Sequence, residues 1–260
     1  TGRDDFEEDC AGRPEVTVIE SPVGLTRQRN AALDRIVDRF DVIVFLDDDM
    51  QLERNYIASA LRFLADQPAV VGFSGHLLRN GRITRSEARQ VVDEYRPEDR
   101  DFRPAFRCRG KYWTLHGCNM VLRAAVLKYE RFDENLPLYG FAEDYDLSLR
   151  IRGYGLVGRF RECVAAHLEP PSGRVSDKKL GYSTLANNWY FLRKRLTHCP
   201  TLLAGYVRFV LRLAVFEPLQ NATFALLGHR NRAMRLWGNL AALRDILVGT
   251  CSPHRITELD

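Results

Sequence analysis

The sequence predicts an α/β protein in which a mostly parallel sheet is flanked by helices and followed by a helical C-terminal region. Short apolar runs rich in β-branched residues alternate with amphipathic segments through the first part of the chain, which is the pattern of such a sheet. The last third is helical in pattern almost throughout. The chain has 260 residues and is 45% hydrophobic and 28% charged, so it can bury a sizeable core.

Three apolar runs are typical of strands: VTVIE at 16–20, VIVFL at 42–46 and AVVGFSG at 69–75. The run at 42–46 is continuously apolar, as expected for a strand that is covered on both faces. Helical patterns lie between the runs. The order strand, helix, strand, helix, strand therefore predicts parallel pairing with helices on both faces of the sheet.

Two amphipathic helices are expected between these strands. The first lies within 22–40, with Ser21 or Thr26 as its N-cap, and its apolar face comprises Leu33, Ile36, Val37 and Phe40. The second covers 55–66, with Asn55 as its N-cap.

The later part of the chain changes character three times. Residues 80–112 are rich in charge and predict a helix plus a long loop. Periodic patterns return at 112–127 and at 139–155, where a helix is expected to end near Gly153 or Gly155. From about 182 to the end, the sequence predicts helices.

Charge is distributed unevenly along the chain. Residues 174–260 hold 13 Lys and Arg against 5 Asp and Glu, a net charge of +8, whereas 1–173 carry a net charge of −4. This contrast predicts two units, an α/β domain at 1–173 and a basic amphipathic helical tail at 174–260. Such a tail suits nucleic acid, an anionic lipid surface or an acidic partner.

The tail favours a lipid surface over the other two partners. Arg208, Arg212 and Glu217 interrupt its longest apolar segment, and the sequence has no uncharged apolar run of about 18 residues. We therefore expect a helix that lies at an interface rather than one that spans a membrane. Nucleic-acid binding is not expected, because the basic residues lack the interleaved aromatic side chains of a stacking platform.

The six cysteines are scattered and form no CxxC pair. This spacing argues against a zinc site or a disulfide framework and favours reduced thiols in a cytoplasmic protein. No signal-peptide pattern is visible in the sequence. We therefore expect a cytoplasmic location, peripheral on the inner face of the cell membrane.

Three acids, Asp47, Asp48 and Asp49, directly follow the strand predicted at 42–46. In an open α/β sheet, ligands bind beyond the carboxyl ends of the strands. Alternation along an extended segment points Asp47 and Asp49 to the same side and Asp48 to the other. Two carboxylates at a crevice suit Mg²⁺ or Mn²⁺. The alternative is a solvated acidic turn.

A second acidic group comprises Glu143, Asp144 and Asp146 in the motif AEDYD. Acids are favoured in a first helical turn by the helix dipole, so this group has an ordinary structural explanation. Beside a metal site, however, Asp144 becomes a candidate general base. His167 follows another apolar run, at a predicted strand end, where its imidazole could complete a metal shell or serve a structural role.

These segments, in this order, resemble the family 2 glycosyltransferases of the GT-A fold. The resemblance rests on GLTRQRNAAL (24–33), VIVFLDDDM (42–50), HGCNMVLR (116–123), FDENLPLYGFAEDYDLSLRIRGYG (132–155) and AAHLEPPSGR (165–174). Two tail segments, LGYSTLANNWYFLRKR (180–195) and RLWGNLAALRDILVG (235–249), are similar to those of bacterial members that build surface polysaccharides.

The resemblance implies an activity and its cofactor. A hexosyl or deoxyhexosyl group would pass from a nucleotide-diphosphate donor to a hydroxyl of a glycan or lipid-linked acceptor, with inversion at the anomeric carbon. The cofactor would be a divalent cation, Mn²⁺ or Mg²⁺. Residues 1–173 would be the catalytic domain of a GT-A fold, and the tail would provide peripheral membrane contact.

The resemblance also implies roles for individual residues. Asp144 would be the catalytic base, and the metal would be held by Asp47, Asp49 and His167. Nucleotide contacts would come from Arg29, Asn30 and Asp47. Substrate contacts would come from Trp113, Gly117, Cys118, Asn119, Tyr139 and Glu143, with the two aromatic rings available for stacking on sugars.

One departure from the family pattern is expected to matter. The sequence starts where the second strand of the family would end, so about 40 residues of a βαβ unit are expected to be absent, which would leave an exposed sheet edge. Two other functions stay open at this point. One is a metal-dependent nucleotidyltransferase, and the other is a catalytically degenerate module that docks partners or membrane.

Overall fold

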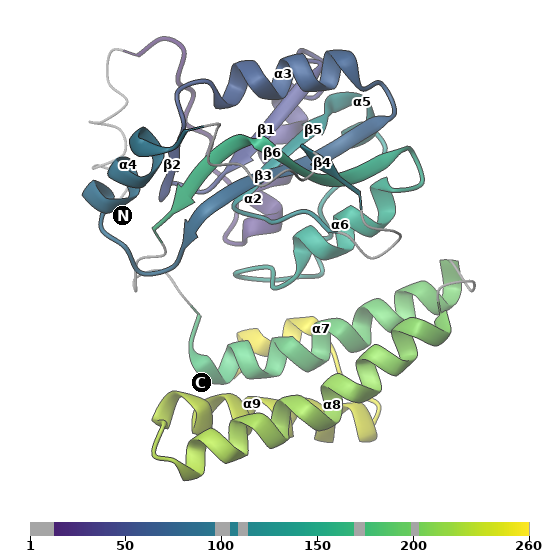
Figure 1. Cartoon of the computed structure of the whole chain (residues 1–260). Helices are drawn as coiled ribbons and strands as arrows, with labels where there is room; N and C mark the ends of the chain where they lie inside the picture. Colours follow the sequence, from purple (N-terminus) through teal and green to yellow (C-terminus); the bar gives the residue numbers. More distant parts are fainter. Residues whose placement is uncertain (1–12, 97–104, 109–113, 169–174, 199–202, 260) are drawn as a thin grey trace.

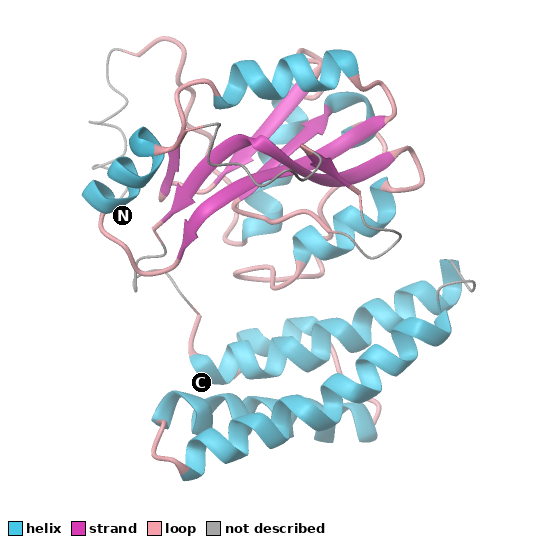
Figure 2. Ribbon diagram, in the orientation of Figure 1, coloured by secondary structure: helices cyan, strands magenta, loops and turns pink. Residues whose placement is uncertain are grey.

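A computed structural model describes residues 13–96, 105–108, 114–168, 175–198 and 203–259. Its strands are β1 (Val42–Leu46), β2 (Met50–Leu52), β3 (Val70–Asn80), β4 (Phe106–Arg107), β5 (Asn119–Arg123) and β6 (Leu156–His167). Its helices are α2 (Leu25–Ile36), α3 (Tyr56–Asp66), α4 (Arg85–Glu94), α5 (Ala124–Leu127), α6 (Glu143–Ile151), α7 (Asp177–His198), α8 (Leu203–Leu226), α9 (Arg230–Leu247) and the 3₁₀ helix η4 (Pro253–Thr257). The sheet lies among helices α2 to α6, and helices α7 to α9 form a separate layer (Figures 1 and 2).

The sheet is mixed. Its strand order is β1-β5-β3-β6-β2, and β4 pairs with β6. Among the described strands, only β3 and β6 pair in parallel. The predicted α/β class is confirmed, but the expectation of mostly parallel pairing is wrong. The reason is that β5 runs between β1 and β3 in the opposite direction to both, so these two strands point the same way without being neighbours.

Two local expectations near the start of the described chain are also wrong. Residues 16–20 form no strand, and Val16 and Val18 are 41% and 48% exposed, because no described strand lies beside them to pair. Gly24 occupies the N-cap position of α2 without a side-chain cap. Thr26 lies within the helix instead, where its hydroxyl donates to the carbonyl of Leu136 at 3.2 Å.

Helices cover both faces of the sheet, as the continuous apolar pattern of β1 predicts. On one face, α3 buries Tyr56, Ala60 and Leu64 in a cluster with Val70 and Phe73 of β3. On the other face, the apolar sides of α2 and α6 pack against β1, β3 and β5, and this cluster includes Leu33, Val37, Val71, Met120, Leu122, Leu147 and Ile151. The carboxyl end of β1 is thereby fixed between two packed layers.

The C-terminal helices form a compact group of their own. Glycine permits the closest approach between α7 and α9, since a Cβ added to Gly238 would lie 2.0 Å from the carbonyl oxygen of Lys178. Asn239, which is buried, donates to the carbonyl of Gly181 at 2.8 Å and fixes the same contact. Within the described part of the chain, no helix is both long enough and apolar enough to cross a membrane.

Candidate active site

The three acids form a tight turn between two strands. β1 ends at Leu46 and β2 begins at Met50, so Asp47, Asp48 and Asp49 are the connection. The amide of Asp47 donates to the carbonyl of Cys118 at 3.2 Å, and the amide of Met50 donates to the carbonyl of Asp47 at 3.3 Å. Asp48 is exposed, whereas Asp47 and Asp49 are half-buried, so the turn separates Asp48 from its neighbours as the alternation predicts.

The short strand β2 brings Asp49 to the end of β6. Met50 pairs with His167 in antiparallel register, and the amide of Leu168 donates to the carbonyl of Asp49 at 3.1 Å. As a result, Nε2 of His167 lies 3.1 Å from Oδ1 of Asp49. The other ring nitrogen lies 2.8 Å from Oδ1 of Asn80, which fixes the ring plane.

Asp47, Asp49 and His167 fit a divalent cation. Each offers one ligand atom, and these atoms all lie within 4.8 Å of one another. Oδ1 of Asp49 is buried, and apart from Nε2 of His167 at 3.1 Å it has no polar neighbour within hydrogen-bond distance among the described residues, as expected of an oxygen kept for an ion. Two carboxylates and an imidazole are a donor set that suits Mn²⁺ or Mg²⁺. Burial also raises the pKa of Asp47, although the guanidinium of Arg29 acts against this.

The second acidic group occupies the first turn of α6. The loop before it contains three left-handed residues, Leu138, Gly140 and Ala142, at φ values of 57°, 62° and 64°. Asp144 is half-buried at the helix start. Its Oδ2 accepts from the amide of Gly117 at 2.7 Å, and its Oδ1 accepts from the amide of Tyr145 at 2.7 Å. Two backbone donors therefore fix the orientation of this carboxylate.

Arg29 joins the two acidic groups. Its guanidinium contacts the Glu143 carboxylate through Nη1, and its Nη2 lies 3.5 Å from Oδ1 of Asp47. Nη2 also donates to the carbonyl of Gly117 at 2.9 Å. Glu143 is buried, and this burial raises the pKa of its carboxyl group to about 8 because desolvation outweighs the attraction of Arg29.

Gly117 lies where the two acidic groups meet. A Cβ added at this position would lie 2.8 Å from Oε1 of Glu143 and 3.4 Å from Oδ2 of Asp144. A side chain here would push the Glu143 carboxylate away from its position beside Arg29, so glycine favours the observed arrangement of the acids. Both its amide and its carbonyl are used by the site, through Asp144 and Arg29.

Three other predicted site residues belong to the framework of the site. Asn30 donates to the carbonyl of Phe132 at 2.9 Å and accepts from its amide at 3.0 Å, which anchors the start of the loop before α6. Asn119 is fully buried, and its Oδ1 accepts from the Tyr56 hydroxyl and from a backbone amide of β3. Cys118 is buried, which raises the pKa of its thiol to about 12.

The two aromatic candidates differ in what the structure describes. Tyr139 is 54% exposed in the loop before α6, so its ring is accessible to a ligand. Trp113 lies outside the described residues.

Sequence reasoning missed His116, which precedes Gly117 and lies close to both acidic groups. Its amide donates to the hydroxyl of Ser74 at 2.7 Å, which holds the segment against β3. Burial lowers the pKa of its imidazole, while the charge of Asp144 acts in the opposite direction. The signal for His116 was its place in the HGCN motif next to Gly117.

A surface pocket of about 420 Å³ lies elsewhere, between α7, η4 and the loop before α6. It is lined by Asn135, Tyr190, Arg193, Lys194, Cys251, Ser252, Pro253 and His254. None of the acids that converge around Arg29 lines it. The pocket is therefore distinct from the candidate active site.

Comparison with known proteins agrees with the motifs of this site. The sequence model of Glycosyl transferase family 2 matches residues 3–130, which include Arg29, the acidic turn and Gly117. The matched segment of the chain is similar to the glycosyltransferases of family 2. A curated relative is an uncharacterized glycosyltransferase, YfnE, from Bacillus subtilis (strain 168), which is 28% identical over 113 residues.

The alignment with YfnE covers 42% of this chain and 27% of the relative, so the chain matches about a quarter of the length of that protein. Among solved structures, a similar one is the mannosyltransferase PcManGT from Pyrobaculum calidifontis in complex with GDP-Man and Mn²⁺. The TM-score is 0.47 at 16% identity, and the match covers 84% of this chain and 65% of that chain.

Proposed function

We propose that this chain is a family 2 glycosyltransferase that transfers a hexosyl or deoxyhexosyl group from a nucleotide-diphosphate donor to a hydroxyl acceptor, with inversion at the anomeric carbon. The observation that carries the proposal is the convergence of two acidic groups of different character. Asp49 pairs with His167 on one side, Asp144 lies on the other, and Arg29 and Gly117 connect the two sides. Transfer of a sugar requires both a site for the departing diphosphate and a base for the acceptor.

Asp47, Asp49 and His167 would hold Mn²⁺ or Mg²⁺ on the donor side. When bound, the ion supplies a Lewis acid that stabilises the negative charge of the departing diphosphate. Asp47 lies nearest to Arg29 and can contact the donor ribose or share the ion. The imidazole of His167 is held by Asn80, so the ring offers its Nε2 without reorientation.

Asp144 would act on the acceptor side as the base. Its carboxylate removes the proton of the acceptor hydroxyl while the hydroxyl oxygen forms a bond to the anomeric carbon. The bond between that carbon and the diphosphate oxygen breaks on the opposite face, so a single displacement inverts the configuration. The two backbone donors of Asp144 hold it in one orientation, which favours proton transfer in a fixed geometry.

The test follows a sugar nucleotide labelled in its sugar and separately in its nucleotide. With the full chain and Mn²⁺, we expect labelled sugar on a hydroxyl acceptor and free nucleoside diphosphate as the second product. Nucleotide joined to a sugar phosphate would instead identify a nucleotidyltransferase. Absence of both metal and nucleotide binding in calorimetry would identify a docking module that has lost catalysis.

We also propose that α8 and α9 contact the inner face of the cell membrane, which would bring a lipid-linked acceptor or a growing glycan to the site. Large apolar side chains are exposed along this part of the chain: Phe209, Leu211, Val215, Phe216, Leu219, Phe224, Leu226, Leu227, Met234, Trp237, Leu240, Leu247 and Val248. Arg208 and Arg212 are exposed among them. Apolar side chains interspersed with arginine are typical of helices that lie on anionic lipid.

Vesicle flotation tests this contact. The full chain should float with vesicles that contain phosphatidylglycerol, and less with vesicles of phosphatidylcholine alone. Phe216→Ser should weaken flotation, because it removes an exposed apolar group of α8. The matched control is Phe40→Ser, since Phe40 is similarly exposed but lies beyond the end of α2. Equal flotation of all three proteins would contradict the contact.

A further inference from the structure

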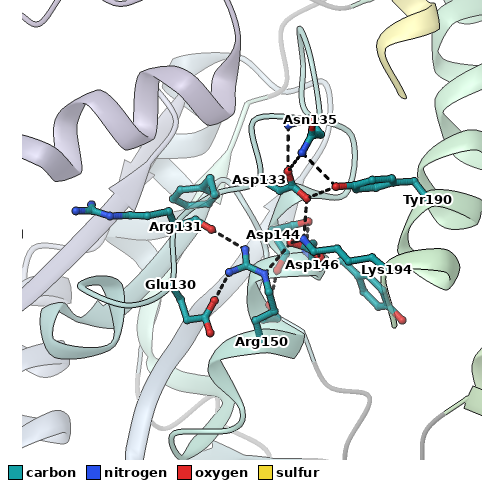
Figure 3. Close-up of polar contacts among 12 residues, drawn as sticks. Glu130, Arg131, Asp133, Asn135, Asp144, Asp146, Arg150, Tyr190 and Lys194 are labelled. Atoms are coloured by element: carbon teal, nitrogen blue, oxygen red, sulfur yellow. Dashed lines mark hydrogen bonds and ion pairs between the residues drawn. The ribbon is translucent and has the colours of Figure 1, made fainter. Parts of the chain in front are cut away.

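Lys194 of α7 lies at the centre of a charged network that joins the helical C-terminal region to the loop and helix carrying Asp144 (Figure 3). Its Nζ donates to Oδ2 of Asp133 at 2.7 Å and to Oδ2 of Asp146 at 3.0 Å. Asp133 opens the loop before α6, and Asp146 lies in the first turn of α6. One ammonium group therefore contacts both ends of the segment that presents Asp144.

The contact with Asp133 is supported by two neighbours. The Tyr190 hydroxyl donates to Oδ2 of Asp133 at 2.8 Å, and the amide of Asn135 donates to Oδ1 at 3.0 Å. Burial alone would raise the pKa of Asp133, but Lys194 and these hydrogen bonds lower it to about 2. The carboxylate is therefore ionised at neutral pH and holds Lys194 by charge as well as by geometry.

The contact with Asp146 is part of a second cluster. Nε of Arg150 donates to Oδ2 of Asp146 at 2.9 Å, and the same guanidinium contacts Glu130 and donates to the carbonyl of Arg131 at 2.6 Å. Asp146 is buried, so its charge depends on these two cations for compensation. Without Lys194, Arg150 would be the one cation that the described residues place against the Asp146 carboxylate.

Further contacts from the same helix region reach the same segment. The side-chain amide of Asn187 donates to the carbonyl of Phe141 at 2.9 Å. Tyr145, which follows Asp144 directly, lies 6.2 Å from the ring of Phe191 and 6.3 Å from that of Tyr206, measured between centroids. Helices α7 and α8 thus contact the residues on both sides of Asp144 in the sequence.

The segment needs such restraint because of its backbone. Leu138 and Ala142 both have left-handed conformations, at φ values of 57° and 64°, which are unfavourable for residues with a Cβ. A loop with two such residues persists only where its surroundings fix it. Lys194 contacts the acids on either side of these two positions, at Asp133 and Asp146.

We propose that Lys194 is a positioning residue, which holds the first turn of α6 so that Asp144 faces the acceptor. The proposal rests on the proposed function, in which Asp144 is the base. It makes the helical C-terminal region a structural part of the acceptor side of the site. Since a misplacement of about 1 Å can slow a reaction by about 100-fold, a single ion pair at this point is sufficient to affect turnover.

The test compares three variants of the full chain. Lys194→Met removes the ammonium and should lower kcat by about 10- to 100-fold, because Asp144 is displaced, while the KM for the donor stays unchanged. Lys194→Arg keeps a cation and should recover most of the rate. Arg193→Met is the matched control, since Arg193 is the exposed neighbour of Lys194 on α7 and should leave kcat unaltered.

Hydrogen exchange gives a second readout that does not depend on transfer. Amides of 143–147 should exchange faster in Lys194→Met than in the wild type or in Arg193→Met. If the wild type transfers no sugar, the proposed function fails, whereas faster exchange in Lys194→Met alone still supports positioning. Wild-type exchange in Lys194→Met overturns the proposal, as does a loss of kcat that Lys194→Arg does not recover.

Discussion

The two acidic groups of the site are compensated by positive charge to different degrees. Among the described residues, the turn at Asp47–Asp49 has one guanidinium, at 3.5 Å from Asp47, and the imidazole of His167, at 3.1 Å from the buried Oδ1 of Asp49. The first turn of α6 has more donors around it, namely Arg29, Arg150, Lys194 and the amides of Gly117 and Tyr145, although Oε2 of Glu143 is buried and accepts no hydrogen bond from the described residues. The chain thus places more positive charge around the acids of α6 than around the acids of the turn.

This difference separates what each group can do. An acidic turn that lacks internal compensation attracts a cation from solution, because neighbouring carboxylates raise one another's energy. An acidic helix turn that is already paired keeps its geometry whether or not a ligand is present. We therefore expect divalent ions to bind strongly at the turn Asp47–Asp49 and weakly at the first turn of α6.

The largest effect should come from the base. Asp144→Asn removes the proton acceptor while the amide side chain keeps the size of the original, so turnover should fall by about 10³-fold or more. Donor binding should stay nearly unchanged, because the proposed function assigns Asp144 to the acceptor. Single-turnover assays and calorimetry with a sugar nucleotide measure the two quantities. An equal loss of turnover and binding would contradict the assignment of Asp144 as base.

The next largest effect concerns Mn²⁺ affinity, which should differ between variants of the adjacent acids Asp48 and Asp49. Asp49→Asn should weaken Mn²⁺ binding by about 100-fold or more, since even outer residues of a metal site contribute 10- to 100-fold to affinity. Asp48→Asn is the matched control, because Asp48 is exposed and lies outside the group with His167. Titration calorimetry measures both affinities. Similar losses in the two variants would point to general acidity rather than to a metal site.

A smaller effect is expected from Asp133, whose pKa of about 2 lies below the ordinary value of 3.8. A lowered pKa stabilises the fold above pH 3.8, and this contribution is lost as the pH falls toward 2. Asp133→Asn should therefore lower the free energy of unfolding by about 2 kcal/mol at neutral pH. The difference in the free energy of unfolding between Asp133→Asn and the wild type should become smaller below pH 3.8.

Denaturant unfolding at several pH values measures the effect of Asp133→Asn. The control is Asp93→Asn, because the ion pair of Asp93 with Arg89 is exposed and should contribute less than about 0.5 kcal/mol. If the loss of unfolding free energy in Asp133→Asn did not vary with pH, the charge of Asp133 would not be the cause of that loss.

The smallest effect concerns the hydroxyl of Tyr190. Tyr190→Phe removes one hydrogen bond to Asp133, at 2.8 Å, and should lower the free energy of unfolding by about 1 kcal/mol. Tyr129→Phe is the control, since Tyr129 is 76% exposed and its hydroxyl lies outside this network. Chemical denaturation at neutral pH compares the two. A larger loss in Tyr129→Phe would contradict the role given to Tyr190.

The parts of the fold that the sequence predicts well are local. The apolar run VIVFL forms β1, the amphipathic pattern at 55–66 forms α3, and the acids of AEDYD open α6. Each depends on periodicity within a few residues. The position of the acids after a buried strand was also visible, because the change from apolar to charged residues is abrupt.

The parts that the sequence did not reveal depend on distant contacts. β5 pairs between β1 and β3 although the chain order gives no sign of it. β2 is three residues long, too short for any periodic signal, yet it brings Asp49 to His167. Lys194 contacts Asp133 although the two residues are 61 positions apart, so the local sequence around either residue does not indicate the contact.

β2 lies at the end of the strand order and is bonded to β6 over three residue pairs. Asp49 precedes this strand and His167 ends its partner, so an ion bound to both side chains would cross-link the rim of the sheet. Binding of Mn²⁺ would then stabilise the pairing of the short edge strand β2 with β6, and the stabilisation would increase with the ion concentration. This part of the sheet would become more stable on ion binding even before a substrate binds.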